Sequence, residues 1–259
     1  DTDSDAGDTL SVTGVSNGTG GIVTNGAGAT FTPTGLAAAQ TPIDANFSAS
    51  GSDLGGFAYT DNFIGGAGHT GSAADGSHAA SGNGNGGALH IALGGVNGSD
   101  LTNMNGAYTR TFNLAVAAVV TIQFDYRLQL SGPTENGEDV WALARIDGTS
   151  LVTGGIVDEL DGHGTGSGSS DDTDWQTFTT TVNLTAGSHT LDLGGLMTAK
   201  TDADETATVD FDNVKVSSPA VIFTSGAFDY SVSDGTGADS GHVTITGQSG
   251  STLTGTSAS

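Results

Sequence analysis

Hydrophobic and polar residues alternate in short blocks along the whole chain, and glycine, asparagine and aspartate separate the blocks. In the clearest block, residues 119–130 (VVTIQFDYRLQL), Ile122, Phe124 and Tyr126 share one face of an extended chain. A period of two is typical of a β-strand with one buried face. We expect strands at residues 9–15, 28–33, 88–93, 107–114, 119–130, 140–147, 177–184, 189–193, 207–216, 226–232 and 242–246.

Helical patterns are nearly absent, because no window keeps apolar residues at helical spacing for three turns and glycine interrupts most windows. Many short strands with glycine-rich turns predict an all-β fold of sandwiches or jelly rolls. Three polar segments, residues 65–87, 131–139 and 154–174, are too long for hairpin turns and are predicted to be loops. Loops of this length are usually functional or disordered.

Charge and composition narrow the function classes. The chain has 29 acidic and 5 basic residues, a net charge of −24, and no cysteine. Nucleic acid is not an expected partner, because phosphate binding needs clustered lysine and arginine. The longest nearly apolar run, residues 114–122, is about half of the ~20 residues needed to cross a bilayer, so no membrane insertion is expected. Because the chain has no cysteine to form disulfides, its fold must be stabilised by packing or by hard cations such as calcium.

The two ends of the chain carry the most specific motifs. Residues 1–34 (DTDSDAGDTLSVTGVSNGTGGIVTNGAGATFTPT) resemble the first half of the cadherin-like tandem repeat of large bacterial repeats-in-toxin (RTX) adhesins. Residues 223–246 (FTSGAFDYSVSDGTGADSGHVTIT) resemble its second half, which in that family follows directly. The resemblance implies a discontinuous Ig/cadherin-like β-sandwich host, residues 1–34 and 219–259, interrupted by residues 35–218. An insertion at a loop tip is tolerated because loop-closure entropy grows slowly with length.

The insert ends in TATVDFDNVKV (residues 206–216), which resembles the closing strand of jelly-roll carbohydrate-binding modules. A jelly roll also has adjacent termini, which an insert that enters and leaves at one place requires. The resemblance implies a β-jelly-roll, lectin-like module displayed on a secreted adhesin at the extracellular bacterial cell surface. Its implied partners are glycans on cell surfaces, with neighbouring adhesin repeats in the same chain, in adhesion and biofilm formation. The high charge favours a monomer.

Two acidic clusters in the host segments are candidate calcium sites. Alternate side chains of a turning loop can direct their oxygens at one cation, and Ca²⁺ accepts six to eight oxygens in flexible geometry. The RTX resemblance implies calcium within and between such repeats. The alternatives are a solvated acidic linker for the first cluster and simple turn residues for the second. The candidates are Asp1, Asp3, Asp5 and Asp8 in the first segment, and Asp234 and Asp239 in the second.

A third calcium site is expected in the insert. Asp210 and Asp212 point to the same face of the last predicted strand, and Asn213 points to the other. The resemblance to calcium-bearing jelly rolls implies an ion near this strand, with Asp212 as a ligand beside an early residue such as Asp61. The alternative is a solvent-facing pair of aspartates.

Aromatic, acidic and arginine residues of the insert are candidate ligand-binding groups. Tryptophan rings can stack on the C–H faces of a sugar while carboxylates and arginine forks bind its hydroxyls. The alternatives are tryptophans in the sandwich core and a cross-strand salt bridge from Arg127 to Asp125 or Asp147. The candidates are Trp141, Trp175, Arg127, Arg145, Glu138 and Asp139.

The acidic loops of the insert offer a second mode, in which sugar hydroxyls replace waters on a bound calcium ion. The sequence leaves open which acids converge. The candidates, beyond Glu138 and Asp139, are Asp158, Asp161, Asp171, Asp172, Asp174, Asp202, Asp204 and Glu205.

Catalysis is not expected. The six histidines show no metal-binding spacing, and no serine lies in a nucleophile elbow. The sequence therefore predicts a calcium-dependent adhesin region with a glycan-binding insert. The alternatives are a peptide-binding or purely structural spacer module, with a polysaccharide-degrading enzyme as a third choice.

Overall fold

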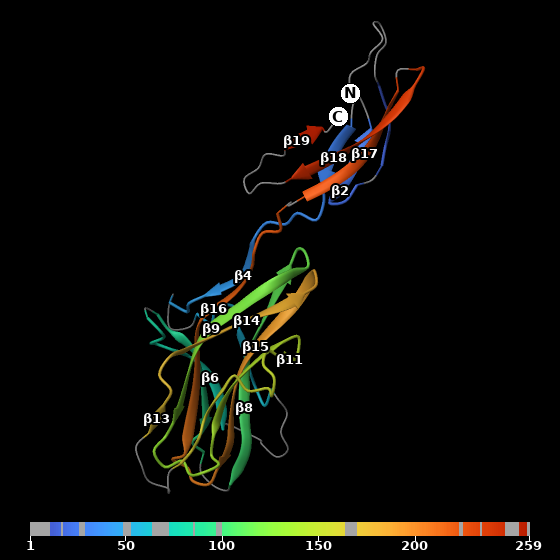
Figure 1. Ribbon diagram of the computed structural model, residues 1–259. Helices are drawn as coiled ribbons and strands as arrows, with labels where there is room; N and C mark the ends of the chain where they lie inside the picture. Colours follow the sequence, from blue (N-terminus) through green and yellow to red (C-terminus); the bar gives the residue numbers. More distant parts are fainter. Residues whose placement is uncertain are drawn as a thin grey trace. The chain divides into compact units, whose positions relative to one another are not determined.

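The computed structural model describes residues 11–16, 18–25, 29–48, 53–63, 73–84, 86–96, 100–163, 170–222, 225–233, 235–246 and 254–257. All regular structure in these ranges is β-strand (Figure 1), which confirms the prediction of an all-β fold. No helix in the described ranges has the length and hydropathy that a membrane span requires.

The chain forms two compact units. Unit 1 comprises Asp1–Ala39 and Pro219–Ser259, and unit 2 comprises Gln40–Ser218. The expected insert began at residue 35, and residues 35–39 fall in unit 1.

Unit 1 joins the two ends of the chain in one sheet. Strand β1 pairs antiparallel with β17, and Ser11 lies opposite Ser233. A small core of Val23, Phe228 and Ile245 packs between this sheet and a hairpin. The sheet has the order β1 (Ser11–Val15), β17 (Ser225–Ser233), β18 (Ala238–Thr246) and β19 (Thr254–Ser257), and the hairpin consists of β2 (Gly21–Asn25) and β3 (Ala29–Pro33).

Unit 2 is a sandwich of a six-stranded and a seven-stranded sheet. The six-stranded sheet has the order β11 (Thr149–Ser150), β10 (Val140–Ile146), β15 (Gly187–Lys200), β8 (Leu101–Leu114) and β5 (Ala58–Asp61), and β12 (Asp158–Leu160) also pairs with β10. The seven-stranded sheet has the order β13 (Asp171–Asp172), β9 (Ala118–Leu130), β16 (Thr206–Ser218), β7 (Ala88–Gly94) and β6 (Ala74–Ala79), with β14 (Gln176–Leu184) beside β9 and β4 (Gln40–Ala45) beside β16.

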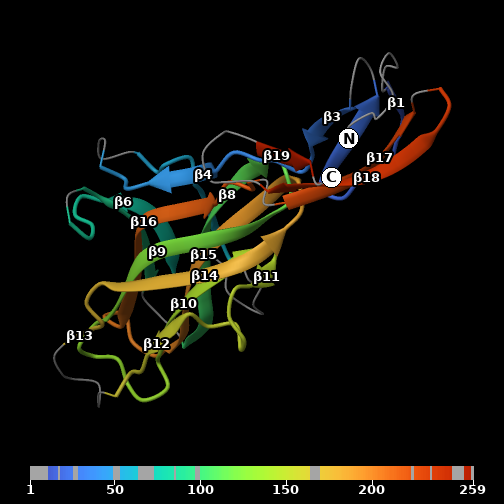
Figure 2. The same cartoon turned by 45° about the horizontal axis from the view of Figure 1, so that its top comes forward.

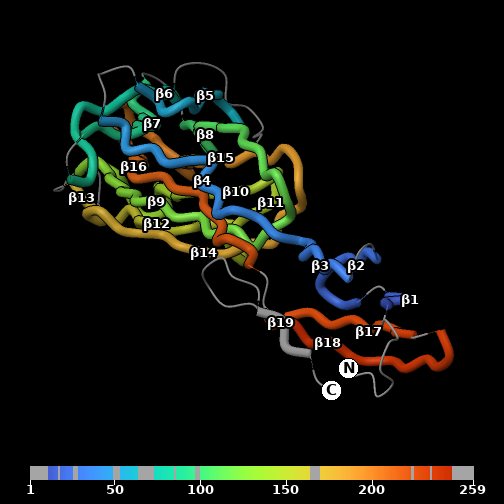
Figure 3. The backbone as a smooth tube through the Cα atoms, turned by 90° about the horizontal axis from the view of Figure 1, so that it is seen from above, coloured from blue at the N-terminus to red at the C-terminus, as the bar shows by residue number. Residues whose placement is uncertain are grey.

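The alternation seen in the sequence builds the core of unit 2. Ile122, Phe124 and Leu128 of β9 point inward and are fully buried, and they belong to the same hydrophobic cluster as Leu191 and Leu193 of β15 in the other sheet. Figure 2 shows β14, β9 and β16 side by side. The first and last strands of unit 2, β4 and β16, also lie side by side (Figure 3), so the two ends of the unit meet.

Several strand predictions need correction. Strands β2, β4 and β5 were not predicted, β8 begins at Leu101 rather than at residue 107, and the predicted loop at residues 154–174 contains β12 and β13. Residues 65–87 are not one loop, because β6 forms within them and pairs with β7. The strand predicted at residues 189–193 continues to Lys200 through Gly194 and Gly195. Glycine lowers strand propensity, which hid this extension. Gly195 is required by close packing, since a Cβ there would lie 2.8 Å from Cγ2 of Val209.

Candidate functional site

The outer face of the six-stranded sheet carries two of the predicted ligand-binding residues. Val140 and Ala142 of β10 lie in the core, so Trp141, Leu143 and Arg145 lie on the opposite face of the strand. Each of these three residues faces one residue of β15 across the ladder: Trp141 faces Leu196, Leu143 faces Gly194 and Arg145 faces Asp192. We call this surface the outer face.

A small, open hollow of about 10 Å³, room for about one water molecule, lies on the outer face. Small residues of the two central strands, Ala107 and Gly194, leave room for it. Its apolar lining comes from Leu143 and from Phe63, which follows β5. Its charged lining consists of Arg145 and Asp192. The hollow therefore combines apolar surface with one strong donor and one strong acceptor.

Asp192 is held rigidly in this hollow. Its side chain is almost fully buried, at 4% exposure, and Thr109 Oγ1 donates a hydrogen bond of 2.9 Å to its Oδ1. Burial raises the pKa of Asp192, and the Thr109 hydrogen bond and the charge of Arg145 only partly oppose this effect. The sequence analysis did not single out Asp192, although it is the one acid between inward-facing Leu191 and Leu193.

Arg145 is the basic residue without a polar partner among the described residues. Its guanidinium carbon lies 5.9 Å from the centre of the Phe63 ring, a cation–π distance. The other four basic side chains are engaged: Arg127 with Asp172, Lys215 with Asp44, Lys200 with the carbonyl of Asp202, and Arg110 with the carbonyl of Gly55. No described residue therefore occupies the five donors of the Arg145 fork.

An acidic cluster borders Trp141. The indole Nε1 of Trp141 donates a hydrogen bond of 2.7 Å to Glu159 Oε1, which fixes the plane of the half-exposed ring. Carboxylate oxygens of Asp139, Glu159 and Asp161 lie within 4.8 Å of one another. Asp139 and Asp161 were predicted candidates, and Glu159 was missed because only its pairing on β12 brings it opposite Trp141.

Glu138 does not face the outer surface. It is 4% exposed, and its carboxylate accepts a hydrogen bond of 2.7 Å from the backbone N–H of Glu135. Burial raises the pKa of Glu138, and the nearby charge of Glu205 adds to this rise. Glu205 is itself buried and accepts hydrogen bonds from the backbone of Thr201 and Asp202. These two glutamates close turns.

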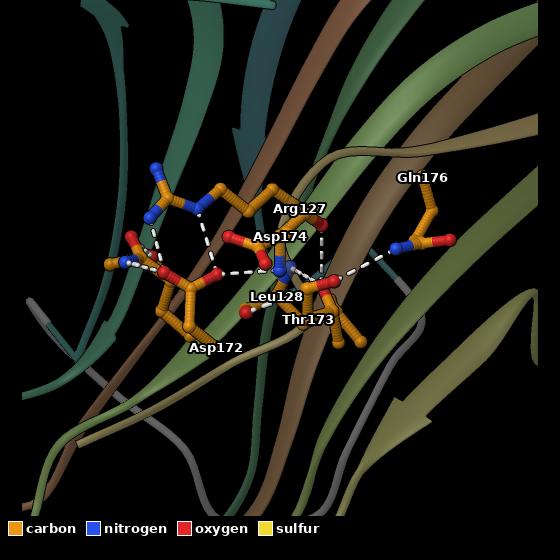
Figure 4. A network of polar contacts seen from close by, with 8 residues as sticks. Arg127, Leu128, Asp172, Thr173, Asp174 and Gln176 are labelled. Carbon is orange, nitrogen blue, oxygen red and sulfur yellow. Dashed lines mark hydrogen bonds and ion pairs between the residues drawn. The ribbon is translucent and has the colours of Figure 1, made fainter. Parts of the chain in front are cut away.

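Arg127 lies on the seven-stranded sheet, on the other side of the sandwich from Arg145. Its Nε donates a hydrogen bond of 2.9 Å to Asp172 Oδ1, and its terminal amino group forms an ion pair with the other oxygen (Figure 4). The Asp172 hydrogen bond raises the pKa of Arg127, and the same contact lowers the pKa of Asp172. Arg127 therefore makes the salt bridge of the alternative prediction, but its partner is Asp172.

Trp175 is also remote from the outer face. It is half-buried, follows Asp174 with its positive φ of 54°, and precedes β14 of the seven-stranded sheet. The predicted ligand-binding residues therefore do not form a single pocket. Arg145, Trp141 and Asp139 gather at the outer face, whereas Arg127 and Trp175 lie on the opposite side.

Asp212 lies in a network of oxygen-rich side chains on the seven-stranded sheet. It is 1% exposed and faces Asp125, which is 6% exposed, across the β9–β16 ladder. Its two oxygens accept hydrogen bonds from the backbone N–H groups of Asn83 (2.8 Å) and Asn213 (2.6 Å). The side-chain amides of both asparagines donate to Asp125, as does Thr177 Oγ1. Burial, followed by the charge of Asp125, raises the pKa of Asp212.

The chemistry of this network fits a hard cation. Two buried carboxylates side by side repel each other, and a cation would remove the repulsion. The cation ligands that this network offers are carboxylate oxygens, which calcium prefers, whereas the two asparagine amides turn their N–H groups to Asp125. Asp61, the expected co-ligand, lies on β5 of the other sheet and is not part of the network. The solvent-facing alternative is also wrong, because Asp210 is 7% exposed and bonds His90 at 2.6 Å.

The host calcium candidates are mostly beyond what the structure describes. Asp1, Asp3, Asp5, Asp8 and Asp234 lie outside the described residues. Asp239 lies on β18 opposite Val232 and accepts a hydrogen bond of 2.7 Å from the backbone of Ser240.

The comparisons with known proteins give structural neighbours. No family model and no curated relative matches the sequence. The K1 cleaved adhesin domain of Lys-gingipain from Porphyromonas gingivalis W83 is 12% identical with a TM-score of 0.37, covering 70% of this chain and 98% of that domain.

Two carbohydrate-binding modules match similarly. A family 35 module from Clostridium thermocellum is 15% identical with a TM-score of 0.30, covering 70% of this chain and 98% of the module. TmCBM27, which recognises mannan, is 15% identical with a TM-score of 0.36, covering 70% and 99%. At such low identities and TM-scores, the similarity does not assign a ligand to this chain.

Proposed function

We propose that unit 2 is a glycan-binding module and that the outer face is its binding surface. The observation that carries the proposal is the hollow lined by Phe63, Leu143, the buried Asp192 and Arg145, which has no polar partner in the part of the chain that the structure describes. Sugars present apolar C–H faces together with hydroxyls, so a site for them needs apolar walls and fixed donors and acceptors. The hollow supplies both.

Trp141 extends the same surface. Two residues along an extended strand span about 7 Å, so Trp141 lies one such step from Leu143 and two from Arg145 on the same side of β10. The bond to Glu159 holds the indole in place, and a ring held in this way stacks on a sugar with little loss of conformational freedom. The surface is therefore long enough for more than one sugar ring.

The proposal includes a calcium ion at Asp212 and Asp125. An ion there would join β9, β16 and the segment of Asn83, and would remove the repulsion between two buried carboxylates. Because this network lies on the other sheet from the hollow, calcium at this position would stabilise the fold rather than bridge the sugar.

The wider setting is an RTX-type adhesin at the bacterial surface, in which unit 1 belongs to the stalk. The resemblance of residues 1–34 and 223–246 to one interrupted repeat supports this proposal. The pairing of β1 with β17 is consistent with it, because both segments contribute to one sheet. The module would bind without catalysing a reaction.

A peptide-binding module is the second candidate. Strand β14 is nine residues long, has no charged side chain, and pairs in the described structure only with β9. An edge strand of this kind offers backbone groups to an extended peptide.

A glycan array separates the two candidates. The full chain is applied in millimolar calcium with Arg145→Gln and Trp141→Ala, and Trp175→Ala serves as the matched aromatic control. The proposal predicts defined glycan hits that the first two variants lose and the control keeps. A blank array with folded protein would contradict the proposal and favour the peptide-binding candidate. Glycan hits lost only in the control would contradict the outer face as the binding surface.

A further inference from the structure

The charged pair in the hollow has an unusual arrangement. Arg145 and Asp192 lie directly opposite each other on β10 and β15, yet no direct ion pair joins them among the described contacts. Asp192 is instead bonded to Thr109, and the Arg145 guanidinium lies against Phe63. A strong donor and a strong acceptor thus line the same hollow, and no described contact joins them directly.

Only certain chemical groups can hydrogen-bond to both side chains at once. A guanidinium has hydrogen-bond donors and no acceptor, and an ionised carboxylate has acceptors and no donor. A group that bridges them must accept from Arg145 and donate to Asp192. A hydroxyl does both, whereas a carboxylate or sulfate of the ligand could satisfy only Arg145 and an ammonium could satisfy only Asp192.

We propose that the hollow selects a neutral sugar, whose adjacent hydroxyls bridge Arg145 and Asp192, and rejects the corresponding uronic acid. This inference rests on the proposed function of the outer face and adds the class of saccharide that it recognises. Phe63 and Leu143 then contact the C–H surface of the same ring.

The electrostatics of the hollow favour this selection. Asp192 is 4% exposed, so water screens its charge poorly and a second anion beside it would be repelled. The net charge of −24 repels anionic ligands in addition. A single arginine on this surface therefore does not make an anion site.

The test compares sugars that differ only in the group at C6. The probe is an array that pairs glucosides with glucuronides, galactosides with galacturonides and mannosides with mannuronides of the same linkage. The full chain is compared with Asp192→Asn, Arg145→Gln and Asp210→Asn, and Asp210 is the matched buried aspartate on the other sheet. Circular dichroism checks that each variant is folded, and Asp192→Glu replaces Asp192→Asn if that variant is not.

The proposal predicts that neutral members bind at least about tenfold more tightly than their uronic partners. Asp192→Asn should weaken the binding of neutral sugars about 10- to 100-fold, as expected for a hydrogen bond to a charged group. The same variant should reduce the difference in affinity between each neutral sugar and its uronic acid. Asp210→Asn should change neither the affinity for neutral sugars nor this difference in affinity.

Uronic acids that bind as well as neutral sugars, or an Asp192→Asn variant with unchanged affinity, would overturn the inference while leaving glycan binding in place. No binding of any sugar by the wild-type chain, or binding that Arg145→Gln does not alter, would overturn the proposed function itself.

Discussion

The buried histidine of unit 2 leads to a sharp prediction about stability and pH. His189 is 6% exposed, with Nδ1 2.7 Å from Asp147 Oδ2 and Nε2 2.9 Å from the carbonyl of Thr185. Both partners are acceptors, and a neutral imidazole has only one N–H donor. His189 is therefore expected to be a protonated imidazolium that joins the end of β14 to the turn after β10.

The contribution of His189 to the free energy of unfolding can be estimated from these two hydrogen bonds. A hydrogen bond that involves a charged group contributes about 1.5–3 kcal/mol. Asp147 is 46% exposed, so its carboxylate regains water when the imidazole is removed, and its share must be discounted. We expect His189→Gln to lower the free energy of unfolding by about 1–3 kcal/mol at pH 5.5.

The pH dependence has a definite sign. The bonds to Asp147 and Thr185 raise the pKa of His189, so its contribution is present below the unfolded pKa of about 6.5 and is lost as pH rises through the folded pKa. Burial raises the pKa of Asp147, but the hydrogen bonds from His189 and Thr190 outweigh it and lower that pKa. The contribution of Asp147 is present above about pH 3.9 and is lost as pH falls through its folded pKa.

Urea unfolding followed by tryptophan fluorescence measures this effect, because both tryptophans of the chain, Trp141 and Trp175, lie in unit 2. The deficit of His189→Gln, meaning its loss of unfolding free energy relative to the wild-type chain, should shrink between pH 5.5 and pH 9. His163→Gln is the matched control, since His163 is 72% exposed and lies 3.4 Å from Asp171. A deficit that stays constant or grows at pH 9, or one equalled by the control, would refute the reasoning.

Three further predictions follow from other parts of the structure. Calcium should stabilise unit 2 by about 2.7 kcal/mol at a hundredfold excess over Kd and so raise its melting temperature, measured by calorimetry with and without chelator. Asp212→Asn should abolish this shift in melting temperature, and Asp61→Asn should not. Gly195→Ala should destabilise unit 2 by about 1–3 kcal/mol in urea unfolding, because its Cβ would lie 2.8 Å from Val209. Arg127→Ala should lower the free energy of unfolding by about 1 kcal/mol or less in the same measurement, because the side chains of Arg127 and Asp172 are each 30% exposed. The variant should leave glycan affinity unchanged, because this ion pair lies on the other sheet from the hollow.

Local patterns predicted most of the strands but few of their partners. The alternation in β9 reveals which of its residues share a face, whereas for Trp141 on β10 the sequence left both a core position and a surface position open. The register between strands is set by long-range packing, which no local pattern encodes. For this reason neither Asp192 opposite Arg145 nor Asp125 opposite Asp212 was foreseen.

The same limitation explains the wrong partners. The alternative prediction joined Arg127 to Asp125 or Asp147, whereas the two-residue strand β13 brings Asp172 to it. Strand β6 was hidden in a polar, glycine-containing segment because its pairing with β7, rather than its own composition, makes it a strand.

The central claim is that the outer face of the six-stranded sheet binds glycans, and the two tryptophans test it directly. One lies on this face and the other on the opposite side of unit 2, so their indole N–H signals in an NMR spectrum report the two sides separately. The signals are assigned with Trp141→Phe, and a neutral oligosaccharide identified on the array is titrated into the full chain. The account predicts a saturating shift of the Trp141 signal with the Trp175 signal unmoved. A shift of Trp175 alone, or of neither signal while the sugar binds, would contradict it.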